Sequence, residues 1–388
     1  MKEHIDNAEV ESPPVLQGGG LSVLKYVETG TGRVIHFEPF EAKQVVVRPL
    51  DHARLLKVLA SERPSFPFEI TNVKATGVPP DVEGKPLVVT GNMETAAPVA
   101  YGLVDGGWLP MPWANKRIAL LDRNLVIRLE KLRASMSPQD PAGLTKLLGL
   151  DAETVSPLLF ALEGPNRRLP TAAEMDEEFE RAKQALVDLL PGAKLQQIGP
   201  VQRAALHRLV LEQVEFRAKA TQFLLKAAPL VVNRVMPQKR QALEAEVTKF
   251  AVAEGLRRDS LAFLAVVSCI YDGKPPSTHK AATPGRAVLK PKAGYSAQDA
   301  YNALADLSFL ELMFNVGALF TETSFVLYTA DVGLAAFWAA LHPCKRELAY
   351  LGGGISRTTM TFNMMGGLYP DLSDDEARAL SQRIGGDL

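Results

Sequence analysis

Two short, mainly apolar runs of this chain each end in an aspartate, and a helical pattern begins directly after each aspartate. Residues 118–121 lead into Asp122, and residues 324–330 lead into Asp331. An apolar run of this length indicates a buried strand, and the apolar spacing that follows indicates a helix. If the two strands are parallel neighbours, both carboxylates lie at one sheet edge, where α/β proteins bind ligands. The alternative is that each aspartate only caps the helix after it.

The rest of the chain divides into three parts by composition and periodicity. Residues 1–20 are mostly polar and end in three glycines, so we expect a mobile leader. Residues 21–115 are rich in Val, Pro and Gly and show short extended runs, which predicts a small β-rich segment with one helix near residues 51–61. Residues 116–388 hold both strand–aspartate–helix units, separated by a helical stretch over about 172–272. This order predicts an α/β fold whose sheet is interrupted by helices.

Composition and missing motifs exclude several classes of protein. The net charge of -1 gives no general attraction to nucleic acid, so such a partner has to meet a local patch. The two cysteines form no Cys-x-x-Cys pair, which argues against a zinc or disulfide framework and favours a reducing cytoplasm. No apolar run is long enough to cross a membrane, and residues 261–270 indicate a buried helix instead. The glycine-rich stretches lack the Gly-Lys-Ser/Thr ending of a phosphate loop.

Two further acids have apolar surroundings in which an isolated charge is costly. Glu163 ends an apolar segment, and Asp306 lies in an apolar helix where Asp299, seven residues earlier, points in nearly the same direction. Taken alone, Glu163 could be an exposed helix end, and Asp306 could pair with an arginine. Together with Asp122 and Asp331 they would repel one another unless a divalent cation neutralised them. Hard oxygen ligands suit Mg²⁺ or Mn²⁺, which predicts a metal site with Asp299 as the alternative to Asp306.

A basic loop and the residues beside Asp122 supply the predicted contacts to substrate. Residues 273–298 are rich in Pro and Gly and contain lysines and an arginine but no acid. Such a loop could approach phosphates, and the alternative is an ordinary solvated loop. Asn124 would hold Asp122 or a substrate phosphate by a hydrogen bond. The predicted substrate-binding residues are Arg123, Asn124, Lys280, Arg286, Lys290 and Lys292.

The order and surroundings of the acids resemble the PIN domain, a family of metal-dependent ribonucleases. Asp122-Arg-Asn124 resembles the family's Asp-x-Asn after the first strand, and Thr329-Ala-Asp331 resembles its later Thr-x-Asp. Glu163 corresponds to a glutamate on an early helix, and Asp306 or Asp299 to an aspartate on a later one. The resemblance covers residues 118 to about 360. It requires a long helical insertion that compact PIN domains lack.

The resemblance implies a PIN-like, Rossmann-like fold and a cytoplasmic endonuclease that hydrolyses phosphodiester bonds, with RNA as the expected partner. Asp122, Asp306 and Asp331 would bind Mg²⁺ or Mn²⁺, and Glu163 would be a further ligand or a base that orients water. RNA or DNA as the substrate, a protein inhibitor and a homo-oligomer all stay open. No membrane partner is expected.

Two other functions are compatible with the same sequence. In the first, the chain is a non-catalytic interaction protein whose helical region over residues 172–256 binds a partner, and the acids are caps. In the second, it is a metal-dependent phosphohydrolase of a small substrate. Tyr295, Trp108 and Trp113 could stack on bases, but such aromatic residues more often pack in a core.

Overall fold

The computed structural model describes residues 24–27, 34–37, 45–60, 65–73, 75–76, 80, 87–94, 100–111, 118–135, 144–145, 148, 150, 154–163, 168–272, 282–319, 325–352, 355–362 and 367–385. The strands are β1 (Leu24–Val27), β2 (Val34–Phe37), β3 (Val45–Val47), β4 (Ser65–Val73), β5 (Ala75–Thr76), β6 (Leu87–Glu94), β7 (Tyr101–Val104), β8 (Gly107–Pro110), β9 (Ile118–Leu121), β10 (Thr154–Ser156), β11 (Lys194–Leu195), β12 (Phe325–Thr329), β13 (Pro343–Gly352) and β14 (Ile355–Phe362). The helices are α1 (His52–Ala60), α2 (Arg123–Ala134), α4 (Leu158–Glu163), α5 (Ala172–Leu189), α6 (Pro200–Ala227), the short 3₁₀ helix η3 (Ala228–Val231), α7 (Pro237–Ala253), α8 (Leu261–Ile270), α9 (Pro284–Leu289), α10 (Ala297–Leu319), α11 (Val332–Leu341) and α12 (Asp374–Gly385).

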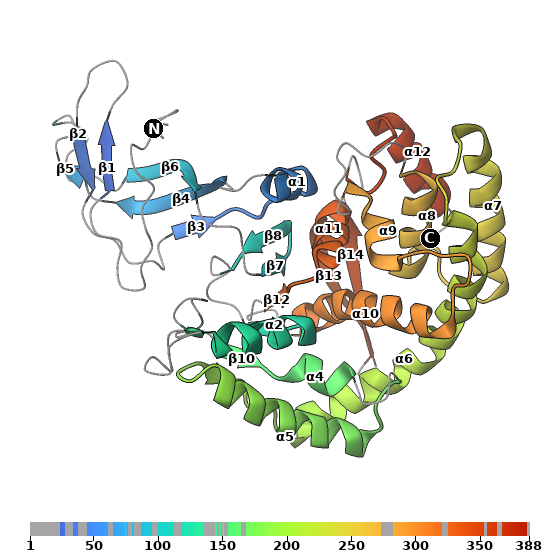
Figure 1. Cartoon of the computed structure of the whole chain (residues 1–388), viewed down its shortest axis with the longest axis horizontal. Helices are drawn as coiled ribbons and strands as arrows, with labels where there is room; N and C mark the ends of the chain where they lie inside the picture. Colours follow the sequence, from blue (N-terminus) through green and yellow to red (C-terminus); the bar gives the residue numbers. More distant parts are fainter. Residues whose placement is uncertain are drawn as a thin grey trace.

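A sheet of six strands lies at the centre of the fold, in the order β11-β10-β9-β12-β7-β8 (Figure 1). Strand β9 pairs in parallel with both β10 and β12, and β10 pairs in parallel with β11. The predicted α/β class is therefore confirmed. The sheet is mixed rather than wholly parallel, because the hairpin β7–β8 adds to β12 in antiparallel orientation. That hairpin comes from the part of the chain before residue 115.

Two glycines explain how this hairpin closes against the rest of the molecule. Gly106 and Gly107 both have a positive φ, which suits a tight turn between antiparallel strands. A Cβ atom at Gly107 would lie 2.1 Å from the Leu50 carbonyl oxygen, so no larger residue fits there. The indole Nε1 of Trp338 donates to the carbonyls of Val104 and Gly107, at 2.8 and 2.7 Å. The turn thereby fastens β7–β8 to α11.

The sheet separates two hydrophobic cores because alternate residues of a strand point to opposite faces. Leu120 of β9 and Leu327 of β12 belong to the larger core, which contains most of the helices. Their neighbours Leu121 and Tyr328 belong to the smaller core, which contains α2 and the end of α5. Helix α11 packs in the larger core. The helices that follow β9 and β12 therefore leave the sheet on opposite faces.

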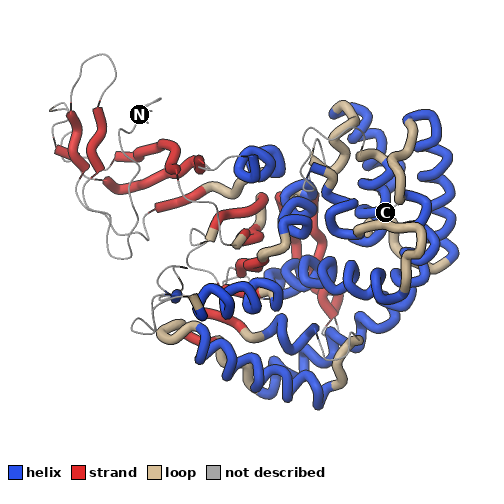
Figure 2. Tube along the Cα trace, viewed as in Figure 1, coloured by secondary structure: helices blue, strands red, loops and turns tan. Residues whose placement is uncertain are grey.

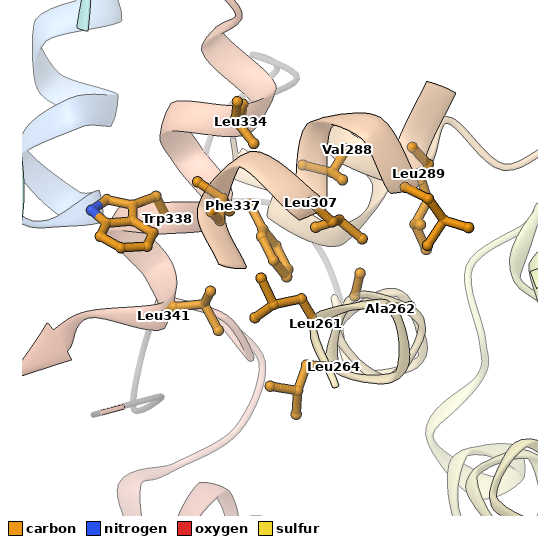
Figure 3. Packing of buried hydrophobic residues seen from close by; sticks show 14 of the residues in the cluster. Leu261, Ala262, Leu264, Val288, Leu289, Leu307, Leu334, Phe337, Trp338 and Leu341 are labelled. Carbon is orange, nitrogen blue, oxygen red and sulfur yellow. The ribbon is translucent and has the colours of Figure 1, made fainter. Parts of the chain in front are cut away.

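Helices α8 and α11 form the centre of the larger core. Every residue of α8 is buried, as the sequence predicts for residues 261–270, and α11 is buried from Leu334 to Leu341. Figure 3 shows Leu261, Phe337 and Leu307 meeting where α8, α11 and α10 approach one another. Burying such side chains stabilises the fold by roughly 1.5–3 kcal/mol each. This packing fixes α11, and with it the aspartate at its start.

The remaining elements agree with most of the predicted organisation. The stretch over about 172–272 is mainly helical, and the N-terminal part contains strands β1 to β6 and helix α1 over residues 52–60. Most helices lie on the far side of the molecule from these N-terminal strands (Figure 2). The predicted loop 273–298 instead contains helix α9, which begins with a proline at its first position. The predicted leader, residues 1–20, lies outside the described residues.

Among the described residues, no helix combines the length and the apolar character that crossing a bilayer requires.

Candidate functional site

Asp122 and Asp331 lie at the same edge of the sheet, as the sequence predicts for parallel neighbouring strands. Leu121 pairs with Tyr328 across the two strands, and the Asp122 backbone N–H donates to the Tyr328 carbonyl at 3.0 Å. In open α/β sheets, ligands bind where the connections after two adjacent parallel strands turn to opposite faces. The strands β9 and β12, followed by α2 and α11, form such a position.

The Asp122 carboxylate is buried and has hydrogen bonds to both oxygens. The residue as a whole is 3% exposed. Oδ1 accepts from the backbone N–H of Asn124 at 2.6 Å, which makes Asp122 the N-cap of α2. Oδ2 accepts from the hydroxyl of Thr329 at 2.5 Å. Thr329 Oγ1 in turn accepts from the backbone N–H of Asp331 at 2.9 Å, so this hydroxyl links the two acidic segments.

Asp331 is also a helix cap, and it has a cation beside it. Its Oδ1 accepts from the backbone N–H groups of Gly333 and Leu334, at 2.6 and 3.1 Å. Its Oδ2 lies 3.5 Å from Nζ of Lys290. Lys290 ends α9 with a left-handed φ of 51°. Helix α9 approaches α11 so closely that a Cβ atom at Gly333 would lie 2.7 Å from the Ala287 carbonyl oxygen, which holds Lys290 near Asp331.

Electrostatics distinguish Asp122 from an ordinary surface cap. Burial raises the pKa of Asp122, and the negative charge of Asp331 raises it further. The hydrogen bonds from Thr329 and Asn124 act in the opposite direction without cancelling the effect of burial. A buried carboxylate near a second one is costly for the fold and attracts a cation or a proton. Pairs of this kind occur at functional sites more often than elsewhere.

Replacing Asp122 by Asn is therefore expected to stabilise the protein in the absence of divalent metal. The pKa of Asp122 is higher in the native state than in the unfolded chain. At a pH above the unfolded-state pKa, ionised Asp122 therefore lowers the free energy of unfolding. Asparagine keeps the capping oxygen and removes this cost. The free energy of unfolding at pH 7 should rise by up to about 1 kcal/mol, and the gain should shrink toward pH 4.

Urea unfolding of the two proteins in chelator, over this pH range, measures that difference. Asp105→Asn, at an exposed turn position, is the matched control and should show no comparable gain. A lower stability of Asp122→Asn at pH 7 would contradict the assigned cost of the buried charge.

The other predicted acids lie on helices α4 and α10. Glu163 is the last residue of α4, and its side chain lies outside the described part. Asp306 is half-buried in the middle of α10. Asp299 lies in the first turn of α10, where it accepts from the Ser296 backbone N–H at 2.8 Å and pairs with Lys292 at 2.9 Å. The Ser296 hydroxyl also donates to Asp299. Hydrogen bonds from this hydroxyl, from Lys292 and from the Ser296 backbone N–H lower the pKa of Asp299 to about 2.

No group of three or more Asp, Glu, His or Cys side chains is arranged to hold a metal ion within the described ranges. The pair that the fold does bring together is Asp122 and Asp331. Ser156 ends the third parallel strand in the same way, since its hydroxyl accepts from the Leu158 N–H at 3.3 Å at the start of α4. Ser156 and Thr329 are not among the site residues predicted from the sequence. For Thr329, its place at the end of an apolar run, two residues before Asp331, was the available signal.

Arg286, predicted to bind substrate, is engaged inside the protein. Its guanidinium pairs with buried Asp272 and donates to the carbonyls of Val231, Val232 and Asn233 at 2.5, 2.8 and 3.0 Å. Those carbonyls belong to the last residue of η3 and to the two residues after it, so Arg286 joins this end to α9.

The other predicted substrate-binding residues lie closer to the surface. Arg123 and Asn124 are exposed at the start of α2, and Asn124 holds Asp122 through its backbone N–H. Lys290 and Lys292 are exposed, and each pairs with an acid. Lys280 lies outside the described residues.

The aromatic residues are core residues where they are described. Trp108 is fully buried, and its Nε1 donates to the Asp51 carbonyl at 3.2 Å. Tyr295 is 6% exposed, and its hydroxyl donates to the Leu289 carbonyl at 3.2 Å. Trp113 lies outside the described residues. Neither Trp108 nor Tyr295 presents a ring on which a base could stack.

Comparison with protein family models, with curated protein sequences and with solved structures found no match. The chemistry of the site therefore follows from its own donors. Asp122, Asp331 and Thr329 offer hard oxygen atoms, and Mg²⁺ is commonly held by one or two carboxylates plus oxygen atoms of the substrate and water. The donor set thus fits Mg²⁺ or Mn²⁺ in its chemistry.

Proposed function

We propose that this chain is a metal-dependent phosphodiester hydrolase whose centre is the pair Asp122 and Asp331. The observation that carries the proposal is the delivery of two carboxylates to one sheet edge by adjacent parallel strands. One of these carboxylates is buried and has a raised pKa. A divalent cation between them would offset both the burial and the mutual repulsion. RNA is the substrate that the resemblance to PIN domains favours, and the cytoplasm is the expected location.

Each residue of the site has a distinct role in this proposal. The Oδ1 atoms of both aspartates accept the hydrogen bonds of their helix caps, so the two carboxylates would hold an ion through their Oδ2 atoms. Thr329 keeps the Asp122 carboxylate oriented through its hydroxyl. Lys290, released from Asp331, meets a phosphate oxygen and neutralises its charge. Bound Mg²⁺ or Mn²⁺ would lower the pKa of a water molecule and stabilise charge on the phosphate.

The position of the basic residues favours a second candidate, hydrolysis of a small phosphate ester. Arg286 is occupied by Asp272 and three backbone carbonyls, so it does not add to an extended basic surface. Within the described residues, Lys290 is the lysine that pairs with an acid of this site, Asp331. One lysine beside two carboxylates suits a single phosphate group, whereas binding a nucleic-acid strand requires several cations along a groove.

Hydrolysis assays with three substrates test both candidates. Single-stranded RNA, single-stranded DNA and bis(p-nitrophenyl) phosphate are each incubated with Mn²⁺, with Mg²⁺ and with chelator. Cleavage of RNA that stops in chelator supports the nuclease. Turnover of the small ester alone supports the second candidate. No metal-dependent hydrolysis of any of them contradicts the proposal.

Metal binding itself is expected to raise the melting temperature. At about 100 times the dissociation constant, a ligand that binds only the native state adds roughly 2.7 kcal/mol to the free energy of unfolding. Differential scanning calorimetry with and without Mn²⁺ measures this effect. Asp122→Asn should lose most of it, and Asp105→Asn should keep it. An unchanged melting temperature for the wild type would favour the non-catalytic interaction protein, in which the acids are only caps.

A further inference from the structure

Helix α6 carries a continuous row of exposed residues at the spacing of a coiled coil. Successive members are three, four, three, four and three residues apart, which keeps them on one face of the helix. All of them are exposed, and two of the apolar ones, Val201 and Leu211, are 81% and 70% exposed. The row, called the α6 strip below, consists of Val201, Ala204, Arg208, Leu211, Glu215 and Ala218.

The opposite face of α6 attaches the helix to its own chain. Ala220, Phe223, Leu224 and Ala227 of that face are fully buried in the larger core. The α6 strip therefore remains available to a partner. A single exposed apolar side chain is ordinary. Apolar, small and charged side chains that keep heptad spacing over about 26 Å of helix are instead typical of a face that packs against a second helix.

The order of residues in the α6 strip is complementary to itself about Leu211. Ala204 and Ala218 lie seven residues before and after Leu211. Arg208 lies three residues before it, and Glu215 lies four residues after it. At about 1.5 Å of rise per residue, the arginine and the glutamate are thus about 4.5 and 6 Å from Leu211 along the helix axis, in opposite directions. Two antiparallel copies bring each arginine opposite a glutamate, whereas two parallel copies would bring like charges together.

We propose that the α6 strip is the contact surface of a homodimer, in which the α6 helices of two copies pack antiparallel about a two-fold axis near Leu211. The two Leu211 side chains meet at the axis. Arg208 of each copy pairs with the partner's Glu215, and Ala204 faces the partner's Ala218. Every contact away from the axis occurs twice, as in any two-fold interface. The proposal is independent of the acid pair and of the hydrolase activity.

The ion pair that Glu215 already forms is compatible with this contact. Lys219 lies 2.7 Å from its carboxylate, on the same helix. A carboxylate has two oxygen atoms and can accept from both cations. Exposed ion pairs of this kind add little affinity and mainly select the orientation of the two helices. The affinity comes chiefly from covering Leu211 and Val201.

The small size of this contact predicts a weak dimer. A single pair of helices buries less surface than a standard protein interface, so we expect a dissociation constant of roughly 1–100 µM. Sedimentation equilibrium of the full chain, from below to well above this range, measures it. A chain that stays monomeric throughout would overturn the proposal.

A charge at the axis tests whether the α6 strip forms the contact. Leu211→Glu places two carboxylates against each other and should weaken the dimer at least roughly tenfold. Val252→Glu is the matched control, because Val252 is 67% exposed on α7, outside the strip. It should dimerise like the wild type. Wild-type dimerisation of Leu211→Glu would show that another surface joins the two copies.

Exchange of the two charges tests the antiparallel orientation. Arg208→Glu and Glu215→Arg should each weaken the dimer at least roughly threefold at low ionic strength, since each brings like charges together. The double variant, with both substitutions, should recover most of the wild-type affinity, because each glutamate again faces an arginine. Circular dichroism melts confirm that every variant is folded. A double variant no stronger than either single variant would overturn the antiparallel dimer.

Discussion

Asp122→Asn and Asp331→Asn are each expected to lower the rate of metal-dependent hydrolysis at least roughly 100-fold. Loss of a residue that only orients a metal ligand typically costs 10–100-fold, and loss of a ligand should cost more. Asparagine keeps the capping hydrogen bond to Asn124 or to Gly333, because asparagine and aspartate are equally good N-caps. The fold should therefore persist while the negative charge is lost. Steady-state rates in Mn²⁺ at pH 7 give the measurement.

The same assay decides between the two candidates for the third acid. Asp306→Asn and Asp299→Asn are measured beside the two strand-end variants. The one that participates should also show a loss of at least roughly tenfold. Full activity in both Asp122→Asn and Asp331→Asn would remove the proposed centre, whatever the third acid does.

Arg286→Ala is expected to destabilise the protein by about 3–5 kcal/mol, the usual cost of leaving a buried charge without its partner. Asp272 is 1% exposed and would keep its carboxylate inside the fold. The carbonyls of Val231, Val232 and Asn233 would also lose their donor. Urea unfolding at pH 7 measures the loss.

Lys292→Ala is the matched control in the same segment. Its ion pair with Asp299 is exposed, and such pairs contribute at most about 1 kcal/mol. Arg286→Ala with wild-type stability would contradict the structural role of Arg286 and return it to the set of substrate-binding candidates.

The comparison of sequence and structure is clearest at the two strand–aspartate–helix units. Residues 118–121 and most of 324–330 form strands, and α2 and α11 follow them as predicted. The mixed character of the sheet was not predicted, because β7–β8 joins it through a glycine turn and pairing with distant residues. The structure of residues 273–298 likewise depends on contacts with residues that are distant in the sequence. Their Pro, Gly and Lys content predicts a loop, either phosphate-contacting or solvated, whereas Arg286 supports a helix there by binding Asp272.

The sequence by itself determined the local elements, since apolar periodicity and capping residues act over a few neighbouring positions. It thereby placed Asp122 and Asp331 at strand ends. Only the tertiary structure decided that these ends are adjacent, with Thr329 bonded to Asp122 across 207 residues of chain. It also decided that Arg286 lies inside and that the residues of the α6 strip stay exposed. The physical reason is that burial and charge depend on which distant segments pack together, and no local pattern of residues specifies that packing.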